Sequence, residues 1–187
     1  SNILGNAYFK KDIRFAPYIR CYIFEDAKRR PVAAIWCHHP KLDAGKMKVP
    51  QASAKLGGNV ESIFDLMEVK HAYNPDNNGN FEFPISSFPV FFRGKPDTLD
   101  VFVEAFDNAM LSSSMEIAPV ALVAKPVSPS MTEIKARNYM SKQFTGIISE
   151  PSGASAELLV PPSGIGKTTL KMPENMRYDK IVAENLQ

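Results

Sequence analysis

The chain has 187 residues, 44% of them hydrophobic, which is enough to bury a core in one large domain or two small ones. Its formal net charge is only +2, and Lys and Arg are interspersed with Asp and Glu, so the composition offers no basic surface for nucleic acid. No apolar run approaches the roughly 20 residues that a membrane-spanning helix needs, so a membrane span is not expected either.

The start of the chain and its cysteines say little about the cellular compartment. The sequence begins with Ser1-Asn2 rather than Met, so we expect a fragment of a longer protein, and the lack of a leader carries no information. Cys21 and Cys37 are too few for a disulfide framework. Because both lie at similar distances from the centre of the first predicted hairpin, a cross-strand disulfide stays open, although two free buried thiols are favoured.

Two extended segments near the N-terminus predict a β-hairpin. Residues 18–26 and 31–38 are rich in aromatic and β-branched residues, and the charged segment 27–30 separates them. Side chains alternate between the two faces of each strand. In the first strand, one face carries Tyr22 and Phe24, and the other carries Cys21, Ile23 and Glu25. In the second strand, one face carries Val32, Ala34 and Trp36, and the other carries Ala33, Ile35 and Cys37. Because both faces carry apolar residues, we expect this pair near the middle of a sandwich.

A second hairpin is predicted after a loop. Residues 40–58 are typical of a loop, with a short strand around 47–49 as the alternative. Residues 60–67 predict a strand that continues past a bulge. The dipeptide Asn78-Gly79 suits the positive φ angles of a tight turn, so residues 81–85 are expected to return beside that strand.

One amphipathic helix follows a further strand at residues 88–92. Apolar residues recur at helical spacing at Leu99, Phe102, Val103, Phe106 and Met110. Asp97 and Asp100 can cap the first turn, so the helix is expected at about 97–111. Short strands separated by Pro, Gly and Ser turns are then predicted at 118–125, 132–138, 146–150, 156–160 and 168–172.

These elements predict a mainly β protein with two antiparallel β-sandwich units and one short amphipathic helix between them. The first unit is expected at residues 1–111 and is closed by the helix. Ser112–Met115 is the expected linker, because a polar break follows the helix there. The second unit, 116–187, is small for a sandwich, so a truncated or incomplete domain is one interpretation.

The segment 158–169 is similar to a phosphate-binding loop, but two features argue against that function. Pro161 stands where such a loop needs Gly, and it has no N–H and a fixed φ. Pro173 follows too soon for a helix, and too little chain remains for a nucleotide-binding sheet. We therefore expect a turn between two antiparallel strands, and no cofactor.

The histidines and the first Cys–His pair do not predict a metal or catalytic site. In an extended strand, Cys37-His38-His39 presents neighbouring side chains to opposite faces, and His71 lies elsewhere in the sequence. A Cys–His nucleophile pair would also need a third group to orient the imidazole, and the sequence suggests none. The interpretation favoured is a strand end with partly exposed imidazoles.

Acidic positions are also incomplete as sites. Asp76, Asn78 and Asn80 alternate as in a calcium loop, but Phe81 and Ser87 stand where that loop needs Gly and Glu. This pattern excludes the helix–loop–helix calcium site and leaves open a loose surface cation. A glycosidic carboxylate pair would come from Glu25, Asp26, Asp65 and Glu68, but their spacing singles out no pair.

Three aromatic residues are the candidates for contact with a sugar or a protein partner. Exposed rings in β-sandwich modules stack on sugar rings, which makes Trp36, Tyr73 and Phe81 worth weighing. Trp36 lies in an apolar strand, which favours a place in the core. Tyr73 and Phe81 flank the Asn-rich turn and are the better candidates for exposure.

Three phrases of the sequence together carry a resemblance to a known protein class. They are Tyr22-Ile23-Phe24-Glu25-Asp26 with Ala33 to Trp36, then Phe64-Asp65-Leu66-Met67, then Phe88-Pro89-Val90-Phe91-Phe92-Arg93-Gly94. In this order they resemble the β-sandwich regions beside the catalytic barrel of large bacterial glycoside hydrolases. Glu68 stands where that class usually has Gly, and Phe91 where Tyr is common. Downstream, 134–138 and 146–148 resemble strands of a further sandwich.

The resemblance implies a non-catalytic accessory module. The catalytic acids would lie in a barrel of the same parent protein, and these domains would brace that barrel or position it on a polysaccharide. It also implies a periplasmic or extracellular location, and no catalytic residue is carried over to this chain. The alternatives are a stand-alone adhesion or protein-interaction sandwich of a surface protein, or a carbohydrate-binding module.

Overall fold

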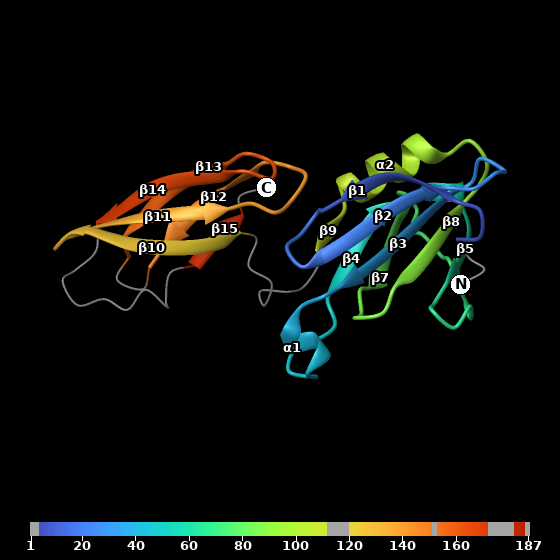
Figure 1. Cartoon of the computed structure of the whole chain (residues 1–187), viewed down its shortest axis with the longest axis horizontal. Helices are drawn as coiled ribbons and strands as arrows, with labels where there is room; N and C mark the ends of the chain where they lie inside the picture. Colours follow the sequence, from blue (N-terminus) through green and yellow to red (C-terminus); the bar gives the residue numbers. More distant parts are fainter. Residues whose placement is uncertain (1–3, 112–119, 151–152, 172–181, 186–187) are drawn as a thin grey trace. The chain divides into compact units, whose positions relative to one another are not determined.

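The computed structural model describes residues 4–111, 120–150, 153–171 and 182–185. Contacts within the chain divide it into two compact units, Ser1–Glu116 and Ile117–Gln187. Both units consist of antiparallel sheets, and short helices account for the rest of the regular structure (Figure 1). The predicted mainly β fold class is therefore confirmed. The expected linker, 112–115, lies outside the described residues.

The first unit contains a six-stranded sheet and a three-stranded sheet. Sheet A has the order β1 (Tyr8–Ile13), β2 (Ile19–Glu25), β3 (Pro31–Cys37), β8 (Val90–Gly94), β5 (Val60–Phe64) and β6 (Lys70–His71). Sheet B has the order β7 (Asn80–Pro84), β4 (Gln51–Lys55) and β9 (Met110–Leu111). The helical elements are α1 (Pro40–Asp43), a 3-10 turn at Gly57–Asn59 and α2 (Leu99–Asp107). As predicted, β2 and β3 form a hairpin away from the sheet edge.

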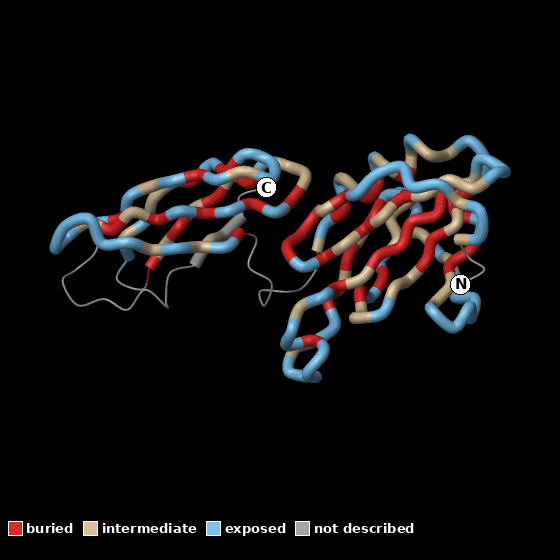
Figure 2. Tube along the Cα trace, viewed as in Figure 1, coloured by how far each residue is buried: buried red, intermediate tan, exposed pale blue. Residues whose placement is uncertain are grey.

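The core of this unit is built around phenylalanine rings between sheet A, sheet B and α2. Phe92 of β8 is fully buried, with its ring centroid 4.8 Å from that of Phe83 and 5.4 Å from that of Phe106. The helix contacts β1, β2 and β3 as well as β4. A Cβ atom built at Gly94 would lie 2.7 Å from a ring carbon of Phe102, so only Gly lets α2 pack against the end of β8. Figure 2 shows buried residues along these strands.

The structure corrects three expectations about the first unit. Strand β4 lies at Gln51–Lys55 rather than around 47–49, and β1 was not predicted at all. The helix ends at Asp107 instead of about 111, because Met110 and Leu111 pair with β4 as β9. Strands β1 and β4 have polar residues at many positions. Their extended conformation therefore depends on pairing with a neighbouring strand and not on local propensity.

The predicted second hairpin is also wrong. Strand β5 pairs with β6 and β8, whereas β7 pairs with β4 in the other sheet. The turn at Asn78-Gly79 does form, since the Gly79 N–H donates to the Asp76 carbonyl oxygen at 3.0 Å. The turn connects β6 in sheet A to β7 in sheet B instead of joining two strands that pair with each other. Turn chemistry is local, but the choice of strand partner is not.

One five-residue turn with an acidic first residue occurs four times in the described chain. In each turn the backbone N–H of the first residue bonds the carbonyl of the fifth, and the acidic side chain accepts a hydrogen bond from the N–H of the fifth. The fourth residue has a left-handed conformation. The acidic residues are Asp26, Asp65, Asp76 and Glu150, and the fourth positions are Arg29 (φ 58°), Glu68 (64°), Gly79 (82°) and Gly153 (98°).

This repeated turn sets the backbone at Glu68 and the spacing of the Asn-rich segment. Glu68 is the fourth residue of the Asp65 turn, and its φ of 64° lies in the region that favours Gly. The alternation of Asp76, Asn78 and Asn80 arises because Asp76 Oδ1 accepts from both backbone N–H groups, each at 2.8 Å. Asp76 Oδ2 accepts from the Asn80 amide at 3.2 Å. The spacing therefore serves a turn, and the carboxylate already has protein donors.

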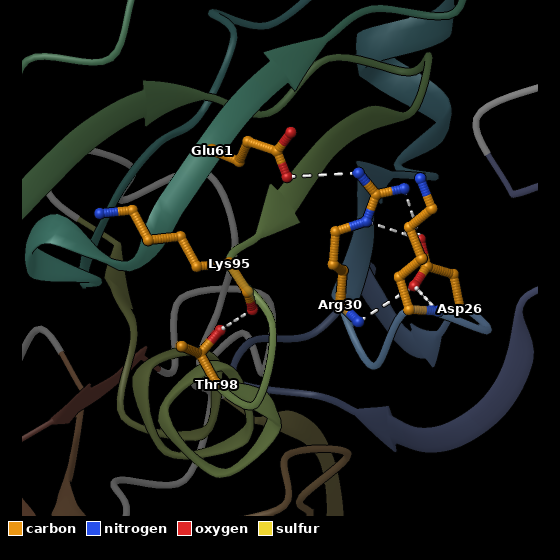
Figure 3. A network of polar contacts seen from close by, with 6 residues as sticks. Asp26, Arg30, Glu61, Lys95 and Thr98 are labelled. Carbon is orange, nitrogen blue, oxygen red and sulfur yellow. Dashed lines mark hydrogen bonds and ion pairs between the residues drawn. The ribbon is translucent and has the colours of Figure 1, made fainter.

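The β2–β3 turn has a further ion pair, shown in Figure 3. The Arg30 guanidinium contacts Asp26 Oδ2 at 2.7 Å and reaches Glu61 of β5 at 3.4 Å. Burial alone would raise the pKa of the Asp26 carboxyl, but the hydrogen bonds from Arg30 and from the Lys28 N–H outweigh it and hold that pKa below 3.8. The backbone N–H of Val69 lowers the pKa of Asp65, and that of Asn80 lowers the pKa of Asp76.

These carboxylates are expected to make the first unit sensitive to acid. A carboxyl whose pKa is lower in the folded than in the unfolded chain stabilises the fold above about pH 4, and this stabilisation is lost as the pH falls through the folded pKa. Asp26→Asn keeps the turn acceptor but not the charge, so its free energy of unfolding should fall less steeply below about pH 4 than that of the wild type. Urea unfolding at a series of pH values measures this. Asp43→Asn in the exposed α1 is the control, and equal slopes for Asp26→Asn and wild type would contradict the prediction.

The second unit is a sandwich of two three-stranded sheets. One has the order β10 (Ala121–Ser128), β11 (Met131–Arg137) and β14 (Ile165–Lys171), and the other has β13 (Ser155–Val160), β12 (Phe144–Ser149) and β15 (Val182–Asn185). Alternate residues of β11 and β12 are buried, and the core includes Ile134, Phe144, Ile148, Val160 and Leu170. The positions of β10 to β14 agree with the predicted pattern of short strands to within a few residues, whereas β15 was not predicted.

The glycines of the segment that is similar to a phosphate-binding loop serve packing in this unit. The turn between β13 and β14 joins strands of the two sheets, and β14 rather than a helix follows it. A Cβ atom at Gly166 would lie 2.5 Å from the Leu159 carbonyl oxygen, and one at Gly164 would lie 2.6 Å from Pro161 Cγ. At Gly166 the close approach of the two backbones requires Gly, and the predicted turn is present in this segment. The strands it joins, however, are not a paired hairpin.

Candidate functional site

Sheet A has an apolar outer face in addition to the face that covers the core. Strand pairing aligns Phe9 with Phe24, and aligns Tyr22 with Ala34, Phe91 and Phe64 in turn across β2, β3, β8 and β5. Paired residues in antiparallel strands point to the same face. We call this surface the aromatic face and define it as Phe9, Tyr22, Phe24, Trp36, Phe64 and Phe91. The strands that carry it lie side by side in Figure 1.

The rings of the aromatic face meet edge to face. Phe9 and Tyr22 are 6.1 Å apart with an interplanar angle of 81°, and Tyr22 and Trp36 are 5.3 Å apart with an angle of 75°. At the other end of the face, the Arg93 guanidinium lies over the Phe64 ring at 5.2 Å. Such T-shaped contacts produce a corrugated surface and not a flat platform of coplanar rings.

Burial within the aromatic face is graded. Val32, Ala34 and Phe91 form a small buried cluster, with Leu4 and several half-buried rings packed against it. Phe9, in β1, is 58% exposed. The predicted separation of the two faces of the hairpin is thus observed, since Cys21, Ile23, Ala33, Ile35 and Cys37 are buried and Tyr22, Phe24 and Trp36 are only half-buried. Trp36, expected in the core, lies on this outer face.

The other two predicted contact residues lie away from Trp36. Tyr73 and Phe81 contact each other at a ring centroid distance of 4.8 Å, and Phe81 also contacts the core ring of Phe92 at 6.1 Å. Phe92 is paired with Ala33 and lies on the core side of sheet A, opposite to Trp36. The Tyr73 hydroxyl donates a hydrogen bond to the Gly57 carbonyl, and burial raises the pKa of Tyr73 to about 12. Trp36, Tyr73 and Phe81 therefore do not form one surface.

The cysteines and histidines have structural surroundings. Cys21 and Cys37 are free and buried on the core side, and burial raises the pKa of both thiols. His39 Nδ1 accepts a hydrogen bond from the Lys41 N–H at the start of α1, and His71 pairs with Asp65 at 3.3 Å. Among the described residues there is no group of three or more His, Cys, Asp or Glu side chains that could hold a metal ion.

A second candidate surface is a hollow of about 450 Å³ in the same unit, which we call the polar hollow. It lies between β4, the turns at 56–59 and 78–80, and α2 with the residues that follow it. Its polar lining residues are Ser53, Lys55, Asn59, Asn78, Asn80, Glu104 and Asn108. No single segment carries more than a few of them, so the sequence contained no signal for this site. For the aromatic face, in contrast, the sequence did contain a signal, because apolar residues occur on both faces of the first hairpin.

In the part of the chain that the structure describes, no helix is long and apolar enough to cross a membrane.

Comparison with known proteins adds no family to this description. Searches against protein-family models, curated proteins and solved structures find no match to this chain.

Proposed function

We propose that the chain is a non-catalytic β-sandwich accessory module that docks through its aromatic face on the catalytic domain of a larger protein similar to bacterial glycoside hydrolases. The observation that carries the proposal is the aromatic face itself. Sheet A already covers the core of its unit with one face, so the rings on the other face add nothing to that core. Apolar rings that stay partly exposed on the face of a sheet away from its core are typical of an interface.

The ring geometry favours a protein over a sugar as the occupant of the aromatic face. Stacking on a sugar uses the flat side of an exposed ring, whereas Phe9, Tyr22 and Trp36 present edges and faces at 75° to 81° to one another. A corrugated apolar surface can interdigitate with side chains of another protein. Leu4 packs at this face, so a domain joined to the chain before it would be tethered beside the surface that we assign to docking.

The surroundings of the acidic side chains favour a supporting role. Glu25 pairs with Lys10 at 3.4 Å, Asp26 with Arg30 at 2.7 Å and Asp65 with His71 at 3.3 Å. A general acid in glycosidic hydrolysis needs a raised pKa, whereas the pKa values of Asp26 and Asp65 are lowered. These carboxylates hold turns and strands in place.

Trp36 supplies a direct test, because it is the only Trp in the chain and lies on the aromatic face. Adding the separately expressed catalytic domain of the parent protein should change Trp36 emission in a saturable manner, because docking removes water from the ring. Tyr22→Ser and Phe9→Ser should each weaken this complex about tenfold or more. Phe88→Ser is the matched control, since Phe88 is 66% exposed but lies outside the aromatic face.

Several outcomes would contradict the proposal. A catalytic domain that leaves Trp36 emission unchanged and forms no complex would rule out docking at this face. Hydrolysis of aryl glycosides by the purified chain above a buffer blank would contradict the non-catalytic assignment. Saturable changes in Trp36 emission on adding oligosaccharides would favour the carbohydrate-binding alternative, and concentration-dependent self-association through Tyr22 would favour an adhesion or protein-interaction sandwich.

A further inference from the structure

Several polar side chains that line the polar hollow have no hydrogen-bond or ion-pair partner among the described residues. Within the described residues, no hydrogen bond or ion pair involves the side chains of Ser53, Lys55, Asn78, Glu104 or Asn108. They supply one hydroxyl, two amides, one ammonium and one carboxylate. Hydrogen-bond donors and acceptors are therefore both available to a ligand that displaces water from the hollow.

One wall of the polar hollow is held in place by a close contact between two glycines. The Gly57 N–H donates to the Gly79 carbonyl at 2.9 Å, and a Cβ atom built at Gly79 would lie 3.1 Å from Gly57 Cα. Both glycines have positive φ angles, 54° and 82°. The Tyr73 hydroxyl binds the Gly57 carbonyl from the other side. A wall fixed in this way limits the loss of backbone freedom on binding.

The size and charge of the polar hollow define the class of ligand. Its volume of about 450 Å³ lies within the range of roughly 300–1,000 Å³ that is usual for small-molecule sites. One Lys and one Glu balance in charge, which disfavours both anions and cations. Leu56, Val101 and Met110 add apolar surface for C–H groups.

We propose that the polar hollow binds a small neutral polyhydroxylated molecule of the size of one or two sugar units. Sugar hydroxyls both donate and accept hydrogen bonds, as the free side chains of the hollow do. None of the described residues that line the hollow is aromatic, so the expected affinity is weak, in the millimolar range. This site is separate from the aromatic face, and either proposal can fail without the other.

A nuclear magnetic resonance titration of the full chain tests the site with lactose, methyl β-D-glucopyranoside and N-acetylglucosamine as probes. At least one of them should produce saturable shifts of the backbone amides of Gly57, Gly79 and Asn108. Asn108→Ala and Glu104→Ala should each weaken binding about fivefold or more, the effect of one lost hydrogen bond. Asn77→Ala is the matched control, because Asn77 is exposed in the same turn but does not line the hollow.

Three results would overturn this proposal. The first is the absence of saturable shifts in the hollow with any of the sugars. The second is saturation by L-alanine instead of the sugars, which would assign the balanced charges to a zwitterion. The third is sugar binding that Asn108→Ala leaves unchanged but Trp36→Ser abolishes, which would place the sugar on the aromatic face and would contradict both proposals together.

Discussion

Replacing Phe92 by Ala is expected to lower the free energy of unfolding of the first unit by about 3–5 kcal/mol. Phe92 is fully buried, and its ring contacts Phe81, Phe83 and Phe106, which come from β7 of sheet B and from α2. The substitution removes the ring that joins these elements to sheet A. The neighbouring rings belong to separate elements and cannot all move to fill the space, so a cavity remains.

Urea unfolding followed by Trp36 emission measures this loss, because the only Trp lies in the first unit. Phe88→Ala removes the same side chain at a position that is 66% exposed, and it should change the free energy of unfolding by less than about 0.5 kcal/mol. Similar losses for the two variants would contradict the assignment of Phe92 to the centre of the core. Phe92→Leu should lose less than Phe92→Ala, because it leaves a smaller cavity.

Replacing Asn138 by Ala is expected to destabilise the second unit by about 2–4 kcal/mol. Asn138 is fully buried, and its side-chain oxygen accepts from the Met140 N–H at 2.9 Å. Its amide donates to the Lys142 carbonyl at 2.7 Å and lies 3.3 Å from the Pro161 carbonyl. The side chain thus bridges the end of β11 and the turn after β13. Alanine would leave the buried Met140 N–H and the partly buried carbonyls of Lys142 and Pro161 without the Asn138 side chain as their partner.

Hydrogen exchange of the β12 amides measures the stability of the second unit separately. Asn138→Asp retains the acceptor for Met140 but places a carboxylate against carbonyl oxygens, so it should destabilise at neutral pH. The pKa of the introduced carboxyl would be higher in the folded chain than in the unfolded chain. Part of the stability should therefore return as the pH falls and the protonated carboxyl becomes a hydrogen-bond donor. Gln143→Ala at the exposed end of the same loop is the control, and a loss equal to that of Asn138→Ala would contradict the prediction.

Local pattern was sufficient for much of the fold. The alternation from Tyr18 to His38 predicted the hairpin of β2 and β3 and the separation of its two faces, because side chains of a strand alternate wherever the strand lies. The segment from Asn74 to Asn80 predicted a turn because Asp and Asn side chains bond to nearby backbone groups and Gly permits positive φ angles, which are also local effects. At Pro161 the sequence predicted a turn that leads into a strand and does not open a helix, and β14 follows the turn as predicted.

Strand partners could not be predicted in this way. Strand β7 pairs with β4 instead of β6, and the end of the predicted helix becomes β9. Each depends on which segment arrives beside it in the folded chain, and no residue of Asn80–Pro84 encodes that identity. The polar hollow could not be predicted for the same reason, because its lining residues come from three separated segments, 53–59, 78–80 and 101–110.

By itself the sequence determined a mainly β chain, the first hairpin with apolar residues on both faces, and the Asn-rich turn at 74–80, because propensity and alternation are properties of short segments. The tertiary structure decided what those segments do. It placed Trp36 on the outer face of sheet A and Phe81 against the core, although both are aromatic residues of strands. The side of a strand that becomes the interior depends on which layer packs against it, and sheet B and α2 cover only one side of sheet A.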